Sequence, residues 1–314
     1  MLAAQLAAAL PEIRAGATKA TVNGHQLDAD SRPQLVARLT EWLYAELHAG
    51  MADRNLSLAL SKRDRWLERA FTEVVPHAAA PVRAVLRSAD ELLLVEWDGV
   101  LVRVPRDRAV LMRSSGEPVG LPGQTAQLPS VGEPIDLLVP PARPALSPGF
   151  LFVDGSRPVD LTSGALRVYV HVSDPDSAVG AWRAVLHALE SASVAYQAKV
   201  LSRARQYPRR DAIVVYLPSA EAAPLVADAV RGLRGIPHET SVFTERLAAG
   251  VATAHEPADP RPGRSGLSFG QHRCLVLAHA LLDAANRGET REPVIARAFL
   301  DAGIDPLHPA RNIT

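Results

Sequence analysis

The chain has 314 residues, enough to bury one substantial hydrophobic core or two. Its 34 basic residues balance its 34 acidic residues, and only 5% of the residues are aromatic. Nucleic-acid-binding domains usually carry a basic surplus and aromatic stacking platforms, so this composition argues against nucleic acid as a partner. Any strongly basic site must therefore be local.

Cysteine usage and hydropathy narrow the class of protein further. Cys274 is the only cysteine, which excludes an internal disulfide and a cysteine-based metal cluster. A chain of this kind suits a reducing compartment, so we expect a cytoplasmic protein. The apolar first ten residues lack the basic start of a secretory signal. No apolar run reaches the roughly 18 residues of a membrane span, so no membrane partner is expected.

The first half of the chain predicts helices followed by β structure. Residues 1–75 are expected to be helical, with a start signal at Ser31 and a stop at Gly50. Residues 90–140 predict strands, including a hairpin with Asp98 and Gly99 as its turn. The proline-rich residues 140–149 are expected to be a spacer. We therefore place one domain at 1–145, helical and β-rich and binding a peptide or partner, and a second at 146–314.

The second half alternates strands with helices. Residues 166–173 alternate as a strand, which puts Arg167, Tyr169 and His171 on one face. Residues 194–201 and 211–218 predict two more strands, and the first places Gln197 and Lys199 on the same side. Helices are expected at 177–191, 221–233, 271–286 and 293–302.

Basic residues crowd the stretch between positions 199 and 211. These are Lys199, Arg203, Arg205, Arg209 and Arg210, against one acid, Asp211. Because guanidinium groups match phosphate oxygens, a phosphate-bearing partner is the functional interpretation. The alternative is a solvated basic loop between two strands, or a structural Arg210–Asp211 pair.

A second segment, SFGQHR, adds a candidate anion site at a helix start. Free N–H groups follow Ser268, and Arg273 lies in the first turn, where a cation is unfavoured unless an anion meets it. The alternative is that Ser268 is only an N-cap and that Arg273 is solvated. His272 is expected on the helix surface, as a reserve acid.

Four pieces of the second half resemble the HopA family of bacterial type III effectors and its biosynthetic relatives. They are ALRVYVHVS, AKVLSRARQYPRRDAIVVYLP, RLAAGVATAHEP and SFGQHR. The resemblance implies an α+β fold: an N-terminal helical and β-hairpin-containing domain, then an α+β lyase-like domain with a mainly antiparallel sheet covered by helices.

The relatives also imply a function. In class V lanthipeptide and thioamitide pathways a separate kinase-like protein phosphorylates Ser or Thr of a precursor peptide, and the HopA-like protein is thought to eliminate the phosphate. The resemblance therefore implies a cofactor-free phosphoserine/phosphothreonine lyase with that peptide and kinase as partners, and a cyclase as a further candidate. Phosphothreonine lyases carry Lys-x-His on the corresponding strand, whereas this chain has Tyr169-Val-His171.

Elimination needs a base, a proton donor for the leaving phosphate, and cations. Lys199 is the predicted base and His171 the predicted acid, with Tyr169 or Tyr207 as alternative donors. The predicted phosphate ligands are Arg203, Arg205, Arg210, Arg246 and Arg273. The predicted supporting residues are Arg167, Asp211, Glu256, Ser268 and His272.

Other functions remain open or are disfavoured. The sequence lacks a Walker loop, a Gly-x-Gly-x-x-Gly motif, a Gly-x-Ser-x-Gly elbow and a paired-histidine metal motif, so we expect no nucleotide, metal or cofactor. The alternatives are a non-catalytic module that binds the precursor or the kinase, and an effector that acts through protein contacts.

Overall fold

The computed structural model of the chain describes residues 1–16, 18–51, 64–97, 99–112, 118–119, 128–162, 164–264 and 266–313. Within these residues the strands form sheets of three, six and seven strands. The strand pairs are antiparallel, and helices cover the largest sheet, so the fold is α+β, as predicted. None of the described helices is long and apolar enough to cross a bilayer.

The first 50 residues contain a small sheet between two helical segments. The elements are α1 (Ala4–Ala9), β1 (Ile13–Ala15), β2 (Lys19–Val22), β3 (His25–Asp28), α2 (Arg32–Leu43) and the π-helix η1 (Tyr44–Ala49). The prediction of helix is wrong for residues 13–28, because β2 buries alternate residues, Ala20 and Val22, as a strand does. Ser31 caps α2, and Gly50 at φ 67° ends η1, as predicted.

The middle of the chain forms the six-stranded sheet with its own apolar core. The elements are α3 (Arg65–Glu73), β4 (Ala80–Ala89), β5 (Leu92–Trp97), β6 (Val100–Pro105), η2 (Arg106–Arg108), β7 (Ala109–Met112), β8 (Pro118–Val119) and β9 (Pro134–Val139). The predicted hairpin is confirmed, because Trp97 pairs with Val100 across Gly99. Asp98 itself lies outside the described residues.

The seven-stranded sheet has the order β10-β11-β13-β14-β12-β16-β15. Its strands are β10 (Ala142–Ser147), β11 (Phe150–Asp154), β12 (Leu166–Val172), β13 (Gln197–Leu201), β14 (Arg209–Leu217), β15 (Glu245–Ala248) and β16 (Val251–His255). The remaining elements are α4 (Pro175–Ser191), η3 (Ala204–Gln206), α5 (Ala223–Val230), α6 (Phe269–Arg287) and α7 (Arg291–Asp301). The expected spacer at 140–149 is instead largely β10, an edge strand, where Pro144 is tolerated.

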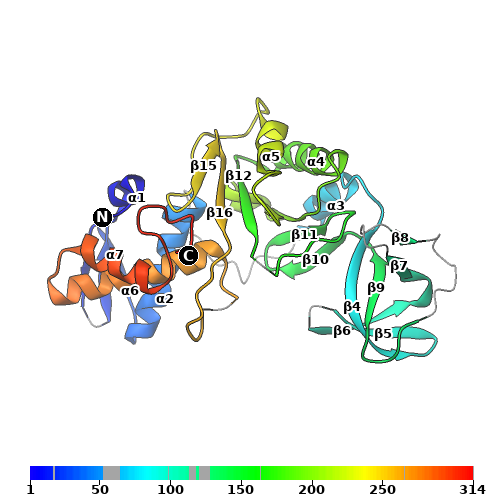
Figure 1. The fold of residues 1–314 in the computed structure, drawn as a ribbon. Helices are drawn as coiled ribbons and strands as arrows, with labels where there is room; N and C mark the ends of the chain where they lie inside the picture. Colours follow the sequence, from blue (N-terminus) through cyan, green and yellow to red (C-terminus); the bar gives the residue numbers. More distant parts are fainter. Residues whose placement is uncertain are drawn as a thin grey trace.

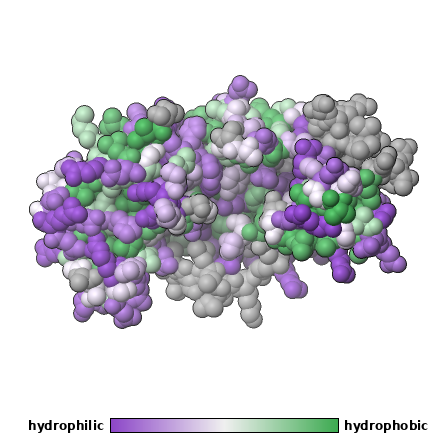
Figure 2. Space-filling model, turned by 60° about the horizontal axis from the view of Figure 1, so that its bottom comes forward, coloured by the Kyte–Doolittle hydropathy of each residue, from purple (hydrophilic) through white to green (hydrophobic). Residues whose placement is uncertain are grey.

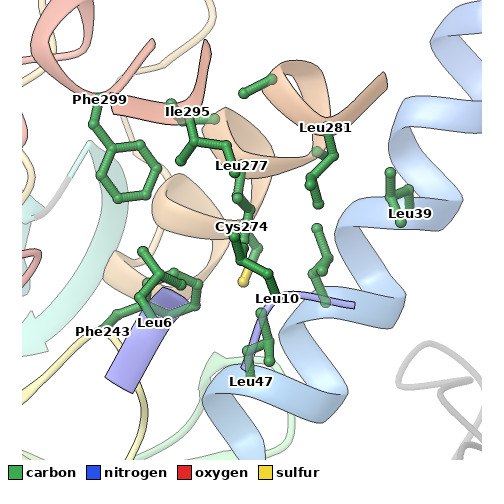
Figure 3. Packing of buried hydrophobic residues seen from close by; sticks show 14 of the residues in the cluster. Leu6, Leu10, Leu39, Leu47, Phe243, Cys274, Leu277, Leu281, Ile295 and Phe299 are labelled. Atoms are coloured by element: carbon green, nitrogen blue, oxygen red, sulfur yellow. The ribbon is translucent and has the colours of Figure 1, made fainter. Parts of the chain in front are cut away.

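The two faces of this sheet are covered differently. The helices α3, α4 and α5 pack on one face in an apolar cluster that includes Val168, Trp182 and Ile213 (Figure 1). The start of α6 packs with α2 and η1 against part of the other face, around Tyr169 and Val214. The first 50 residues therefore share a core with α6 and α7 (Figure 3). The predicted division of roles at residue 145 stays a prediction.

Candidate functional site

Strand register brings three predicted residues onto one face of the seven-stranded sheet. Lys199 pairs with Val214, which pairs with Tyr169. Tyr169 pairs in turn with Ala252, which pairs with Arg246. Because directly paired residues point to the same side, Lys199, Tyr169 and Arg246 share this face. At about 4.8 Å per strand, however, Lys199 lies roughly 10 Å from Tyr169 and about 19 Å from Arg246.

Lys199 is half-buried and contacts two aromatic rings. Its ammonium nitrogen lies 4.6 Å from the ring centroid of Phe150 and 5.9 Å from that of Tyr216. Tyr216 on β14 pairs directly with Arg167 on β12, and the Arg167 guanidinium is 5.1 Å from the Tyr216 ring centroid. Within the described residues Lys199 makes no ion pair. The structure therefore groups Lys199 and Arg167 around Tyr216, which no sequence pattern indicated.

A row of aromatic rings and guanidinium groups in contact follows this face, and we call it the aromatic–cation ladder. Its members in order are Trp97, Arg143, Phe152, Tyr216 and Arg167. Arg143 lies 4.4 Å from the Trp97 ring centroid and 5.0 Å from that of Phe152. The rings of Phe152 and Tyr216 are 6.3 Å apart. Each such cation–ring contact contributes on the order of 1 kcal/mol. Because Trp97 lies on β5, the ladder joins the six-stranded sheet to the larger sheet.

Both arginines of the ladder already have carboxylate partners. Arg143 pairs with Asp154 at 2.7 Å, and Arg167 makes two hydrogen bonds to Glu256. Attraction from Tyr169, Tyr216 and Glu256 keeps the pKa of Arg167 above its ordinary value although burial opposes it. Arg167 and Glu256 are thus brought together, whereas Lys199 and Arg246 on this face have no acidic partner in the described part of the chain.

A buried polar cluster lies beside Phe150, where η1 meets the sheet. The Arg209 side chain, 1% exposed, donates two hydrogen bonds to Asp211, and the Tyr44 hydroxyl donates to the same carboxylate at 2.7 Å. His48 Nε2 is 3.9 Å from Asp211. The Arg209 guanidinium also lies 5.5 Å from the Phe150 ring, so Arg209 and Lys199 share that ring.

The partner of Asp211 is therefore Arg209 and not Arg210. Residues two apart in a strand point to the same side, so the strand period already favoured Arg209 over its neighbour. The Arg210 side chain turns toward η1 instead, where it donates to the Glu46 carbonyl at 3.2 Å. Tyr44 and His48 carried no signal in the sequence, because only the fold brings η1 to this place.

The surroundings of His171, the predicted acid, differ from those of Lys199. Its Nδ1 donates to the Glu239 carbonyl at 2.9 Å, which fixes the neutral tautomer. Burial lowers the pKa of His171, and nearby Arg210 adds to this effect, although the bond to Glu239 opposes it. His171 makes no hydrogen bond to Lys199 in the described residues, and the partner of its Nδ1 proton is the Glu239 carbonyl instead.

The two tyrosines predicted as alternative proton donors also do not present their hydroxyl groups on the exposed face. Tyr169 is buried beneath His48 and Phe269, with ring centroids 5.4 and 6.0 Å away. Burial raises its pKa, although Arg167 opposes the shift. The Tyr207 hydroxyl donates to the Leu201 carbonyl at 2.7 Å, and burial raises its pKa as well.

The polar side chains of the SFGQHR segment bond to other groups of the protein. Ser268 accepts a hydrogen bond from the Gln271 N–H in a capping box, so it is the N-cap that the alternative interpretation expected. The expectation that His272 lies on the helix surface is wrong: it is fully buried and contacts Asp259 at 2.9 Å. Arg273 is fully buried too, and it donates to the Pro309 carbonyl and to Asn312. Burial lowers the pKa of Arg273 to about 10.

The remaining arginines are dispersed. Arg203 is buried against Gly149, whereas Arg205 on η3 and Arg246 on β15 are exposed. The five predicted phosphate ligands therefore do not form one cluster. In the described residues no group of three His, Cys, Asp or Glu side chains could hold a metal ion.

Figure 2 shows the centre of this view set back between two flanking parts of the molecule, with hydrophilic residues along it. Cavities of about 340 Å³, between α6 and α7, and about 660 Å³, beside β1 and α6, lie away from Lys199. The candidate site is therefore the sheet face at Lys199 and not either of these cavities.

Comparison with known proteins finds a matching family model and similar solved structures. The HopA1 effector protein family matches residues 141–311, which is more than half of the chain. A solved structure of the effector protein from Pseudomonas syringae pv. tomato strain DC3000 is 20% identical, with a TM-score of 0.42, over 52% of this chain and 63% of that chain. The effector protein from Pseudomonas syringae pv. syringae strain 61 is 21% identical, with a TM-score of 0.41, over the same shares.

The chain thus spans less than two thirds of the length of either effector. No curated protein matches the chain.

Proposed function

The chain belongs to the HopA1 effector protein family, and from this premise we propose that it is a phosphoserine/phosphothreonine lyase. It acts without a cofactor in the cytoplasm on a ribosomal precursor peptide that a separate kinase-like protein has phosphorylated. The products are dehydroalanine or dehydrobutyrine, in the maturation of a lanthipeptide or thioamitide. One observation carries the proposal: Lys199 is an amine without a carboxylate partner in the described residues, on a sheet face that also carries Arg167 and Tyr216.

The chemistry asks for an amine next to a region of positive potential. A neutral amine removes the α-proton, and fixed cations stabilise the charge that develops on the adjacent carbonyl and on the phosphate. Arg167 and Arg209 lie across the two rings that Lys199 contacts, and their carboxylate partners hold both guanidinium groups in place. These contacts support Lys199 as the base.

The exposed arginines have a different proposed role. Arg246 lies about 19 Å from Lys199 across the sheet, so it does not bind the phosphate that Lys199 acts on. We propose that Arg246 and Arg205 instead bind other parts of a peptide that lies along this face. The ladder from Trp97 to Arg167 supplies further rings and cations for such a peptide.

The test is conversion of a phosphoserine peptide, followed by mass spectrometry. Each elimination removes about 98 mass units, the mass of one phosphoric acid. We expect Lys199→Ala and Lys199→Arg to abolish the loss, since arginine keeps the charge but does not accept a proton at neutral pH. Lys19→Ala, at an exposed lysine on β2, is the matched control and is expected to retain the wild-type rate.

Two results would count against the proposal in different ways. A Lys199→Ala protein that converts the peptide at the parental rate shows that Lys199 is not the base. A wild-type protein that leaves the phosphopeptide intact, although it is folded, shows that the chain is not a lyase for this substrate.

A second function is a non-catalytic module that binds the precursor or the kinase, or an effector that acts through protein contacts. The bond of His171 to Glu239 favours it, because the Nδ1 proton of the acid predicted for catalysis is already donated to a carbonyl. This function predicts that phosphorylated peptide binds more tightly than unphosphorylated peptide in a titration, with no change in its mass.

A further inference from the structure

We propose that Tyr216, and not His171, donates the proton to the leaving phosphate. This inference rests on the proposed lyase function of the same sheet face. It assigns the second half of the proton transfer to a residue that lies beside the base. The argument uses the position of Tyr216, the state of its hydroxyl group and the surroundings of the other candidates.

Tyr216 is positioned by its neighbours on three strands. It pairs with Gln197 on β13 and Arg167 on β12, and its ring packs 6.3 Å from Phe152 on β11. The Lys199 ammonium nitrogen is 5.9 Å from its ring centroid. A phosphoserine residue whose α-proton faces Lys199 therefore has its phosphate oxygen within reach of this phenol.

The hydroxyl of Tyr216 is available, unlike those of the other four tyrosines. Tyr169 and Tyr196 are buried, at 4% and 0% exposure. Tyr44 and Tyr207 donate to Asp211 and to the Leu201 carbonyl. Tyr216 is half-buried, and its hydroxyl makes no hydrogen bond within the described residues. It is therefore the phenol on this face that can meet a substrate oxygen.

A fixed cation lies beside the ring of Tyr216. The Arg167 guanidinium lies 5.1 Å from the ring centroid and is held by Glu256. A fixed cation there stabilises the phenolate that forms when the proton leaves. His171 lacks these features, because its Nδ1 proton is bonded to the Glu239 carbonyl.

The proposed step balances as follows. The Lys199 amine takes the α-proton, and the electrons of the Cα–H bond form the Cα=Cβ double bond. The Cβ–O bond breaks, and its electron pair stays on the phosphate oxygen. Tyr216 gives its proton to that oxygen, so hydrogen phosphate leaves. The Lys199 ammonium then returns one proton, through water, to the Tyr216 phenolate, and the enzyme is restored.

The test is the ratio of wild-type to Tyr216→Phe turnover of a phosphoserine peptide at pH 8 and at pH 5.5. Phenylalanine keeps the ring contacts and removes only the hydroxyl. The second pKa of a phosphate monoester is about 6, so at pH 5.5 the leaving group carries its own proton. We expect a ratio of about 100 at pH 8, the usual contribution of a proton donor, that falls at least tenfold at pH 5.5.

The comparison separates this inference from the proposed function. Lys199, Arg167 and Glu256 are unchanged in Tyr216→Phe, so the ratio reports the loss of the hydroxyl group. Tyr196→Phe, which removes a buried hydroxyl, is the matched control and should give the same ratio at both pH values.

Each contrary result has its own meaning. A Tyr216→Phe protein that is as fast as wild type at pH 8, or equally slowed at both pH values, overturns the assignment of the proton donor, while loss of activity in Lys199→Ala still supports the lyase. A wild-type protein without turnover at either pH overturns the lyase proposal, and the Tyr216 assignment falls with it.

Discussion

Asp211 and Arg209 fix the position of η1 against the sheet through a small buried network. Burial by itself would raise the pKa of the Asp211 carboxyl, but attraction and hydrogen bonds from Arg209 outweigh it and hold that pKa below its ordinary value. Removing one member of a buried ion pair leaves the other charge without a partner, at a cost of about 3–5 kcal/mol. The network therefore stabilises the fold only as long as it stays complete.

His48, next to this network, predicts how stability responds to acid. Burial lowers the pKa of His48 from 6.5 to about 4, and Arg209 and Arg210 add to the effect although Asp211 opposes it. The unfolded chain therefore binds more protons than the folded chain between these values. The stabilisation is complete above pH 6.5 and decreases as the pH falls toward 4, by on the order of 3 kcal/mol.

Denaturant unfolding at pH 7 and at pH 4.5 measures this dependence. In His48→Gln, which cannot be protonated, we expect the difference in unfolding free energy between the two pH values to be smaller than in the wild type. An equal difference in the two proteins would show that His48 does not contribute to the acid response.

At the scale of residues, the sequence identified only part of the candidate site. Lys199 and Arg167 were predicted, because a basic stretch and an alternating strand are local signals. Tyr216 was not, because its contact with Lys199 depends on the register between β13 and β14, which a single sequence does not reveal. Arg273 was predicted as a phosphate ligand, but the C-terminal residues Pro309 and Asn312 take its donors.

At the scale of elements, the contact between η1 and the start of α6 leaves no space for a side chain at one position. A Cβ added at Gly270 would lie 2.2 Å from Cδ2 of His48. Gly270 is therefore required for close packing, although glycine inside a helix ordinarily costs about 0.5–1 kcal/mol relative to alanine.

We predict that Gly270→Ala destabilises the protein by about 2 kcal/mol, the typical cost of overpacking a core. Gly180→Ala in α4 is the control, because a Cβ there meets nothing within 4 Å. This second change should stabilise the protein by about 0.5–1 kcal/mol through helix propensity. Thermal unfolding of both variants measures the difference, and equal effects of the two changes would contradict the packing argument.

The elements that the sequence predicted are those with strong local periodicity. The helix α2 continued by η1, the helices α4 and α6 and the strand β12 agree with their expected spans to within a few residues. The three short strands at residues 13–28 were missed, because strands of three or four residues contain too little periodicity to outweigh the helical pattern around them. The edge strand β10 was missed because its prolines signal a spacer.

At the scale of the whole molecule, the six-stranded sheet forms a core of its own between α3 and β10. Its first and last paired residues, Ala80 and Val139, lie directly opposite each other. The first 50 residues, by contrast, bury their apolar side chains against α6 and α7 and cannot be separated in this way.

We therefore predict that residues 81–138 can be replaced by an Asn-Gly turn without loss of the remaining fold. The shortened chain should unfold in one cooperative transition in a circular dichroism melt. It loses the contact between Trp97 and Arg143, so we expect weaker binding of a phosphopeptide and retention of elimination. A shortened chain without a cooperative transition would show that the two sheets stabilise each other.

The most direct measurement of the central claim is thiol trapping after incubation of the wild-type protein with a phosphoserine peptide. Elimination produces dehydroalanine, which adds a thiol at its β-carbon, whereas hydrolysis produces serine, which does not. The account predicts release of phosphate and one thiol adduct per lost phosphate, both absent in Lys199→Ala. Phosphate release without an adduct, or no release at all from the folded protein, would contradict it.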